Sequence, residues 1–129
     1  GSVEAGTITF GDATITFEKN DGNNAPMYYW NKTEAFRSVR MYAKNSMEMT
    51  ATKNIAKVVI NCAAPYSGTN YNGNDQMTTT AGTISKSADK LSVTIDGINS
   101  KSFTLANEHT AISGGTQLRI VSMTITYAE

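Results

Sequence analysis

The chain has 129 residues and no formal net charge, because 11 basic and 11 acidic residues balance and are scattered along it. No cluster of Lys and Arg stands out, which argues against nucleic acid or an anionic membrane as a partner. No apolar run approaches the roughly 18 residues of a transmembrane helix, so we expect no direct membrane insertion. The length fits a single domain over residues 1–129 with a core of its own. Gly1-Ser2 is typical of the remnant left when a tag is cleaved, so the missing signal peptide does not bear on location.

The composition favours strands over helices. The chain holds 18 Thr and 10 Ile but only 3 Leu. β-Branched residues lose rotamer freedom in a helix and pack well on a pleated surface. We therefore expect short, half-buried strands in which two kinds of side chain alternate with a period of two.

A hairpin is predicted near the N-terminus. Thr7–Phe10 and Ala13–Glu18 both alternate in side-chain type, and Gly11-Asp12 lies between them. Two glycine-compatible residues between alternating runs are typical of a tight hairpin.

The loop between Asn20 and Asn24 (NDGNN) has two interpretations. Its residues tolerate left-handed backbone angles, which indicates ordinary turn chemistry. Its carboxylate and amide oxygens are also ligands that calcium accepts, although their spacing matches no EF-hand loop. A structural calcium ion at residues 20–24 is therefore the alternative, and we expect no other cofactor.

Segment 25–30 (APMYYW) places three aromatic residues in a row. In a strand, Tyr28 and Trp30 share one face and Tyr29 lies on the other. One set is expected in the core, and the other is then exposed or lines a groove. The next segment, 31–36 (NKTEAF), carries a weak capping-box pattern that predicts one helical turn.

The central stretch, residues 38–62, holds three short alternating runs. A turn at Lys44-Asn45 separates the first two runs, and a polar break at residues 52–54 separates the last two. Cys62, the only cysteine, continues the phase of the third run, so we expect a small buried apolar residue and not a reactive thiol. The apolar residues that alternate are Val39, Met41, Met47, Met49, Val58 and Ile60.

The second half of the chain predicts further strands around two loops. The long polar segment 64–83 is expected to be a functional or mobile loop. An Asp96-Gly97 turn interrupts the strands that follow, and a second loop covers residues 106–115. The expected strands are 83–85, 91–95 and 103–105.

The last expected strand, residues 116–127, changes its apolar phase near Val121-Ser122. One extra residue there would restore the phase, which predicts a β-bulge. Nine or ten short strands separated by turn signals indicate an all-β fold. We expect a two-sheet antiparallel β-sandwich, jelly-roll-like in its connections.

The sequence offers few candidate catalytic residues. His109 is the only histidine, it lies in a loop beside Glu108, and no GxSxG-type motif accompanies it. We expect a solvated loop histidine. The carboxylates mostly fall at turns or outward positions, and no pair is set apart for glycoside hydrolysis. No His/Cys cluster indicates zinc and no glycine-rich loop indicates a nucleotide, so we do not expect an enzyme.

The sequence offers more candidate ligand-binding residues than catalytic ones. Sugars are recognised by aromatic rings that stack on their C–H faces and by planar polar side chains that bond their hydroxyls. Arg40 and Tyr42 share a strand face. Tyr66 and Tyr71 lie in the long loop, where no alternating pattern requires them to be buried in the core. The alternative is that Arg40 packs on Tyr42 and the loop tyrosines only pin the loop. The candidate ligand-binding residues are Tyr28, Trp30, Arg40, Tyr42, Tyr66, Asn70 and Tyr71.

Several segments together carry a family resemblance. They are residues 25–29 (APMYY), 39–49 (VRMYAKNSMEM), 55–60 (IAKVVI) and 118–127 (LRIVSMTITY). This pattern resembles a small all-β accessory domain that recurs in surface lipoproteins and secreted multidomain proteins of Bacteroidetes-type gut bacteria. Segment 31–36 departs from it, because it is longer than the short glycine-containing link expected before the Arg-x-Tyr strand.

The resemblance implies an exported or cell-surface location in the bacterial envelope, beside neighbouring domains of a larger protein. It implies a non-catalytic role and assigns no catalytic residue. Arg40, Tyr42, Asn45 and Arg119 match its pattern, and both arginines could instead be structural. We expect an accessory module that binds carbohydrate or another surface ligand in a polar-aromatic groove. The alternative is a structural or adhesion spacer with no small-molecule ligand.

Overall fold

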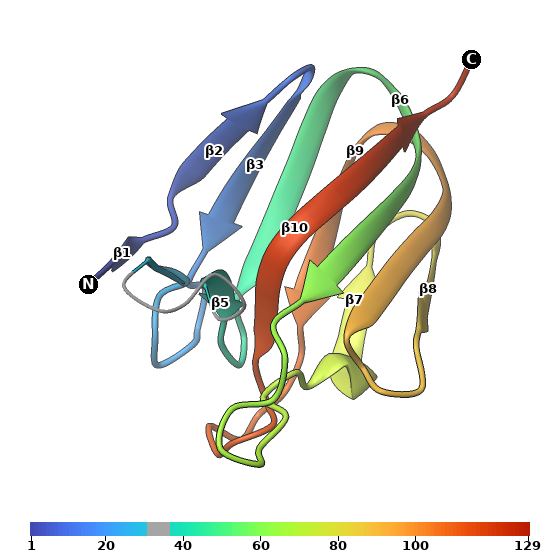
Figure 1. Cartoon of the computed structure of the whole chain (residues 1–129). Coiled ribbons are helices and arrows are strands. Elements are labelled where there is room, and N and C mark those ends of the chain that lie inside the picture. The colour runs from blue at the N-terminus through green and yellow to red at the C-terminus, as the bar shows by residue number, and fades with distance from the viewer. Residues whose placement is uncertain (31–36) are drawn as a thin grey trace.

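The computed structural model describes residues 1–30 and 37–129. In these residues the chain forms ten strands, all paired antiparallel, and one short 3-10 turn, η2 (Figure 1). The helical turn predicted for residues 31–36 lies outside the described residues. No helix in the described part of the chain is long and apolar enough to cross a membrane. The elements are β1 (Ser2–Glu4), β2 (Thr7–Phe10), β3 (Ala13–Glu18), β4 (Met27–Tyr29), β5 (Ser38–Met41), β6 (Ser46–Cys62), η2 (Asn74–Gln76), β7 (Met77–Thr79), β8 (Thr83–Lys86), β9 (Ser92–Asn107) and β10 (Leu118–Tyr127).

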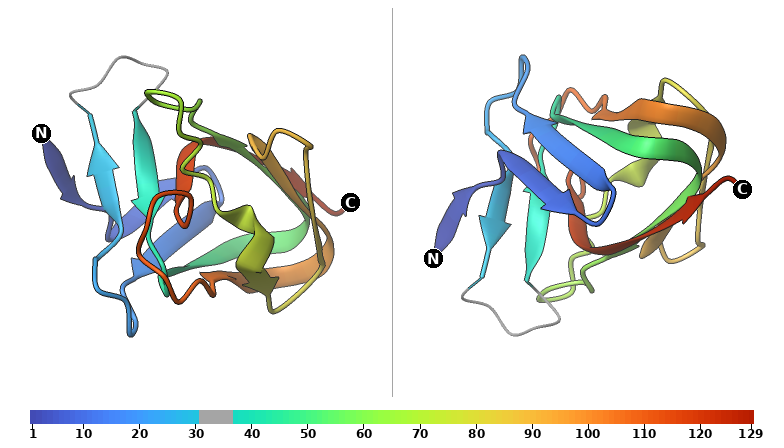
Figure 2. Two further views of the ribbon diagram at one scale, coloured as in Figure 1. Left: turned by 90° about the horizontal axis from the view of Figure 1, so that it is seen from below. Right: turned by 90° about the horizontal axis from the view of Figure 1, so that it is seen from above.

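Two long strands, β6 and β9, shape the molecule. They pair with each other along their length, curve over at the top of Figure 1, and so contribute to two facing layers. The first half of β6 also pairs with β3, and its second half pairs with β10. One layer therefore holds β2, β3 and β7, and the other holds β1, β4, β5, β10 and β8 (Figure 2). This arrangement confirms the all-β antiparallel sandwich, while the jelly-roll-like assignment stays a prediction.

The continuity of β6 and β9 corrects two predictions. The polar break at residues 52–54 does not end a strand, because β6 runs through it with a register shift between Thr50 and Ile55. The predicted Asp96-Gly97 turn is likewise absent, because β9 continues through it. Gly97 (φ 69°) and Asn99 (φ 49°) take left-handed angles inside β9. Residues that interrupt the regular pairing in this way, as in a β-bulge, bend a strand and increase its twist without reversing the chain.

Other predictions hold. Thr7–Phe10 pairs with Ala13–Glu18 as a hairpin around Gly11, and β10 has a register shift between Ile120 and Ser122, where the bulge was predicted. The polar segment 64–83 is more structured than predicted, since it contains η2 and β7.

The core lies between the two layers and is one contiguous cluster. Its residues alternate with outward ones along each strand, as a period of two requires. The inward-facing apolar side chains that are buried include Ile15, Phe17, Val39, Met41, Met47, Met49, Val58, Ile60, Val93, Ile95, Phe103, Leu105, Leu118 and Ile120.

Candidate functional site

Five side chains from three elements and one loop gather on the outer face of β4, β5 and β10. They are Tyr29 of β4, Arg40 of β5, Tyr42 just after β5, Arg119 of β10, and Tyr71 in the loop after β6. We call this group the arginine–tyrosine cluster. Its place follows from strand alternation, because the residues on either side of each arginine face the core.

Strand register brings the two arginines together. Arg119 is the direct partner of Arg40 across the β5–β10 ladder. Residues directly opposite on neighbouring strands point to the same face, with Cβ atoms roughly 5 Å apart. The two positive side chains are therefore neighbours, although they lie far apart in the sequence.

Each guanidinium group stacks on a tyrosine ring. The Cζ atom of Arg40 lies 3.7 Å from the ring centroid of Tyr29, and that of Arg119 lies 3.8 Å from the ring centroid of Tyr71. The Tyr29 and Tyr42 hydroxyls are 3.3 Å apart and share a hydrogen bond. Stacking of this kind fixes a planar cation over the negative face of a ring.

The electrostatic setting of the cluster shifts two pKa values. Burial and the hydrogen bond with Tyr29 raise the pKa of the Tyr42 hydroxyl. Burial, and then the charge of Arg40, lower the pKa of Arg119, which is 7% exposed. Both effects arise because the cluster is partly withdrawn from water, where a charged form is less well solvated.

The loop that carries Tyr71 is held by asparagine side chains and by the start of β10. The Asn72 amide donates to the Ala63 carbonyl (2.9 Å), and its Oδ1 accepts from the Arg119 backbone N–H (2.9 Å). The Gln117 backbone N–H donates to the Tyr71 carbonyl (3.0 Å). These bonds fix the loop backbone against the strand on which Arg119 lies.

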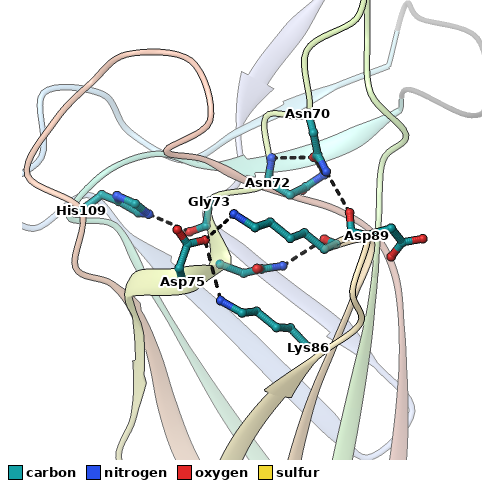
Figure 3. Close-up of polar contacts among 9 residues, drawn as sticks. Asn70, Asn72, Gly73, Asp75, Lys86, Asp89 and His109 are labelled. Carbon is teal, nitrogen blue, oxygen red and sulfur yellow. Dashed lines mark hydrogen bonds and ion pairs between the residues drawn. The ribbon is translucent and has the colours of Figure 1, made fainter.

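Further polar contacts anchor the far side of the same loop (Figure 3). The Asn74 amide donates to the Lys90 carbonyl (2.9 Å), and Asp75 accepts ion pairs from Lys90 (2.8 Å) and Lys86 (3.8 Å). The hydrogen bond from Lys90 is the main cause that lowers the pKa of Asp75. These contacts position the loop, although the buried Oδ1 of Asn74 has no hydrogen-bond partner within the described residues.

His109 has a different place from the one predicted. The sequence predicts a solvated loop histidine, but the side chain is 7% exposed, and its Nε2 lies 3.0 Å from the Gly73 carbonyl (Figure 3). Its backbone N–H donates to Asn107 Oδ1 (3.1 Å). The prediction failed because two loops pack together here, and His109 connects the loop before β10 to the loop of Tyr71.

The structure brings together three of the predicted site residues. Arg40, Tyr42 and Tyr71 belong to the cluster, which also contains Tyr29 and Arg119. Sequence reasoning left these last two out of the candidate site. Strand phase was the available signal, since both lie one position away from core-facing residues.

Tyr28 and Trp30 lie on the opposite face of β4. Their ring centroids are 6.4 Å apart, and Trp30 is 46% exposed. Tyr28 borders an apolar groove of about 340 Å³ between the layers, which Ile8 and Val121 also line. The predicted face-sharing of these two aromatics is confirmed, but the sheet separates them from the cluster.

The remaining candidates lie in the Tyr71 loop. Tyr66 is 48% exposed, and its backbone pairs with Thr69. The Asn70 amide donates to the Asp89 carbonyl (2.9 Å), and its Oδ1 accepts from the backbone and amide of Asn72 (Figure 3). These bonds give Asn70 a role in holding the loop.

The loop 20–24 is tied to the turn before β6. The amide of Asn45, a fully buried residue, donates to the carbonyls of Lys19 (3.2 Å) and Asn24 (2.8 Å), and its Oδ1 accepts from the Tyr42 N–H (2.8 Å). Within the described residues, no group of three or more His, Cys, Asp or Glu is arranged to hold a metal ion. Turn chemistry stays the prediction for this loop, and a calcium ion stays its untested alternative.

Comparisons with protein-family models, with curated proteins and with solved structures found no match to this chain. The class of this protein is therefore defined by its fold and by its candidate site. The chain is an antiparallel β-sandwich that carries two tyrosine-stacked arginines on one outer face.

Proposed function

We propose that this chain is a non-catalytic accessory module that binds carbohydrate at the arginine–tyrosine cluster. The observation that carries the proposal is the convergence of three tyrosines and two arginines on one face of the sandwich. Tyrosine rings offer flat apolar faces with a polar tip, and guanidinium groups donate several hydrogen bonds from one plane. Sugars present matching groups, namely apolar C–H faces and rims of hydroxyls.

Rigidity of the face supports a binding role. Tyr29, Arg40 and Arg119 lie on paired strands, and Tyr71 lies in a loop whose backbone is bonded to β10. A site on strands needs little ordering when a ligand arrives, so less of the binding free energy is lost.

The setting is proposed from the sequence resemblance to envelope accessory domains. We infer an exported or cell-surface protein in which this module lies beside other domains. The Arg40-x-Tyr42 segment that carries the resemblance also supplies Arg40, one of the two arginines of the cluster.

A glycan array with plant, mucin and microbial glycans tests the proposal, followed by calorimetry on each hit. Tyr71→Ala should weaken binding of a confirmed hit by about tenfold or more. One aromatic side chain that stacks on a sugar and hydrogen-bonds to it contributes of order 1–3 kcal/mol to the binding free energy. Trp30→Ala is the matched control, since it removes an exposed aromatic from the opposite face. Loss of binding in Trp30→Ala with Tyr71→Ala unaffected would place the ligand elsewhere.

A spacer or adhesion domain is the second candidate. It is favoured by the fact that the cluster's rings and guanidinium groups already contact one another. In that case the array is blank for all glycan classes, and Tyr71→Ala lowers the free energy of unfolding without changing any binding.

A further inference from the structure

Within residues 1–30 and 37–129, no acidic side chain forms an ion pair with either arginine of the arginine–tyrosine cluster. The ion pairs in this part of the chain involve Lys53, Lys86 and Lys90. Like charges directly opposite each other on neighbouring strands are destabilising. Consistent with this, burial and then the charge of Arg40 lower the pKa of Arg119.

Partial burial makes this arrangement more costly. Arg119 is 7% exposed, and the Arg40 Nε is buried with no hydrogen-bond partner in the described part of the chain. Removing charged groups from water without a counter-charge costs free energy that ring stacking only partly offsets. The protein therefore holds two neighbouring cations that an anion would stabilise.

The stacking also orients the two guanidinium groups. A cation that lies flat on a ring uses its face for the ring and leaves the edge, with its N–H groups, to donate in the plane. The Arg119 Nε donates to Gln117 Oε1 (3.0 Å), which fixes the rotation of that group. Two oriented, planar donors fit the oxygens of a carboxylate or a sulfate better than they fit a lone sugar hydroxyl.

We propose that the ligand of this module is an acidic sugar, whose carboxylate or sulfate binds between Arg40 and Arg119. This inference rests on the proposed carbohydrate-binding function and names the class of sugar. The Tyr29 and Tyr42 hydroxyls lie beside the arginines and bond hydroxyls of the same sugar. The shared chemistry is an anionic group on a pyranose ring, and the experiment separates its two sources.

The test uses the whole chain and pairs of matched glycans. Oligosaccharides that contain uronic acids are compared with the same compounds after carboxyl reduction, and sulfated oligosaccharides with the same compounds after desulfation. Calorimetry should show a loss of about tenfold or more on neutralising the anion, as expected for a lost charge-assisted hydrogen bond. The arm in which the loss occurs identifies the carboxylate or the sulfate as the source.

Variants test the assignment to the two arginines. Arg40→Gln should remove the preference for the acidic member of each pair, and Arg119→Gln should do the same. Lys101→Gln is the control, because it removes the same charge from an exposed position on β9. Arg119 is buried, so circular dichroism checks that its variant folds. If the Arg119→Gln variant does not fold, the glycan pairs still test the inference on the unmodified chain.

The outcomes are distinct. Equal affinity for the acidic and neutralised members of every bound pair overturns the inference and leaves carbohydrate binding in place. Absence of binding to all glycans, acidic and neutral, overturns the proposed function and the inference together. A preference for the acidic member that Arg40→Gln and a folded Arg119→Gln both keep overturns the assignment to these arginines.

Discussion

Arg40, Tyr42 and Asn45 lie close together in the sequence, yet each has a different physical role. Arg40 stacks on Tyr29, Tyr42 shares a hydrogen bond with the same tyrosine, and Asn45 holds the loop 20–24 through two backbone carbonyls. Strand phase predicted the face on which Arg40 lies. It could not predict the stacking partner, because that depends on how β4 is registered against β5.

His109 and Gly73 show why a loop contact escapes sequence reasoning. A Cβ atom at Gly73 would collide with the Gly115 carbonyl and the Thr116 Cα, and it would lie 2.9 Å from His109 Nε2. The absence of a side chain at Gly73 thus permits the two loops to meet. Nothing local to either loop indicates that meeting, so a lone loop histidine is predicted to be solvated and is found buried.

Cys62 carries a prediction about reactivity. Burial, with a smaller contribution from the charge of Asp89, raises the pKa of its thiol to about 12. The thiolate is the reactive form, so the native protein at pH 8 should react with iodoacetamide far more slowly than the unfolded chain. Mass spectrometry after timed labelling measures this, with urea-unfolded protein as the control. The sequence predicts a buried cysteine, and the structure places Cys62 half-buried against the core. Equal rates in the two states would contradict this partial shielding of the thiol.

At the scale of elements, local signals predicted what is local. The hairpin β2–β3 follows from Gly11-Asp12, and the bulge in β10 follows from a change of apolar phase. The turn predicted at Asp96-Gly97 was wrong, although Gly97 does take a left-handed angle (φ 69°). The same signal serves a turn and a bend, and what decides between them is the continued pairing of β9 with β6, a contact between distant segments.

Gly97 in the bend of β9 carries a prediction about stability. Its φ is +69°, and no atom lies within 4 Å of the site of an added Cβ, so Gly97→Ala changes only the backbone preference. We expect a loss of about 1–2 kcal/mol in the free energy of unfolding, the usual cost of a left-handed angle for a residue with a Cβ. Urea denaturation measures it. Gly6→Ala is the matched control, because Gly6 has the same open space without the left-handed angle, and it should cost nothing or stabilise slightly.

For the whole molecule, composition and period predicted the class of fold, and the path of β6 and β9 determined the rest. Abundant β-branched residues and alternating runs were sufficient for an antiparallel sandwich. The division into layers could not be predicted, because it depends on which half of β6 pairs with β3 and which with β10. The candidate site was predicted in part for the same reason. Arg40 and Arg119 each had a predictable face, but only the β5–β10 register makes them neighbours.

The shared strands predict that both layers unfold together. Ile15 of β3 and Leu118 of β10 are buried in opposite layers of one core. Truncating either to alanine should cost about 2–5 kcal/mol through lost burial and a new cavity. Because β6 and β9 belong to both layers, each variant should shift a single transition, with the same midpoint by far-ultraviolet circular dichroism and by fluorescence of Trp30, the only tryptophan. Val3→Ala, at an exposed site on β1, should change the midpoint little. If Ile15→Ala lowered the circular-dichroism midpoint and left the Trp30 transition in place, the layers would unfold separately, and the bent strands would not couple them.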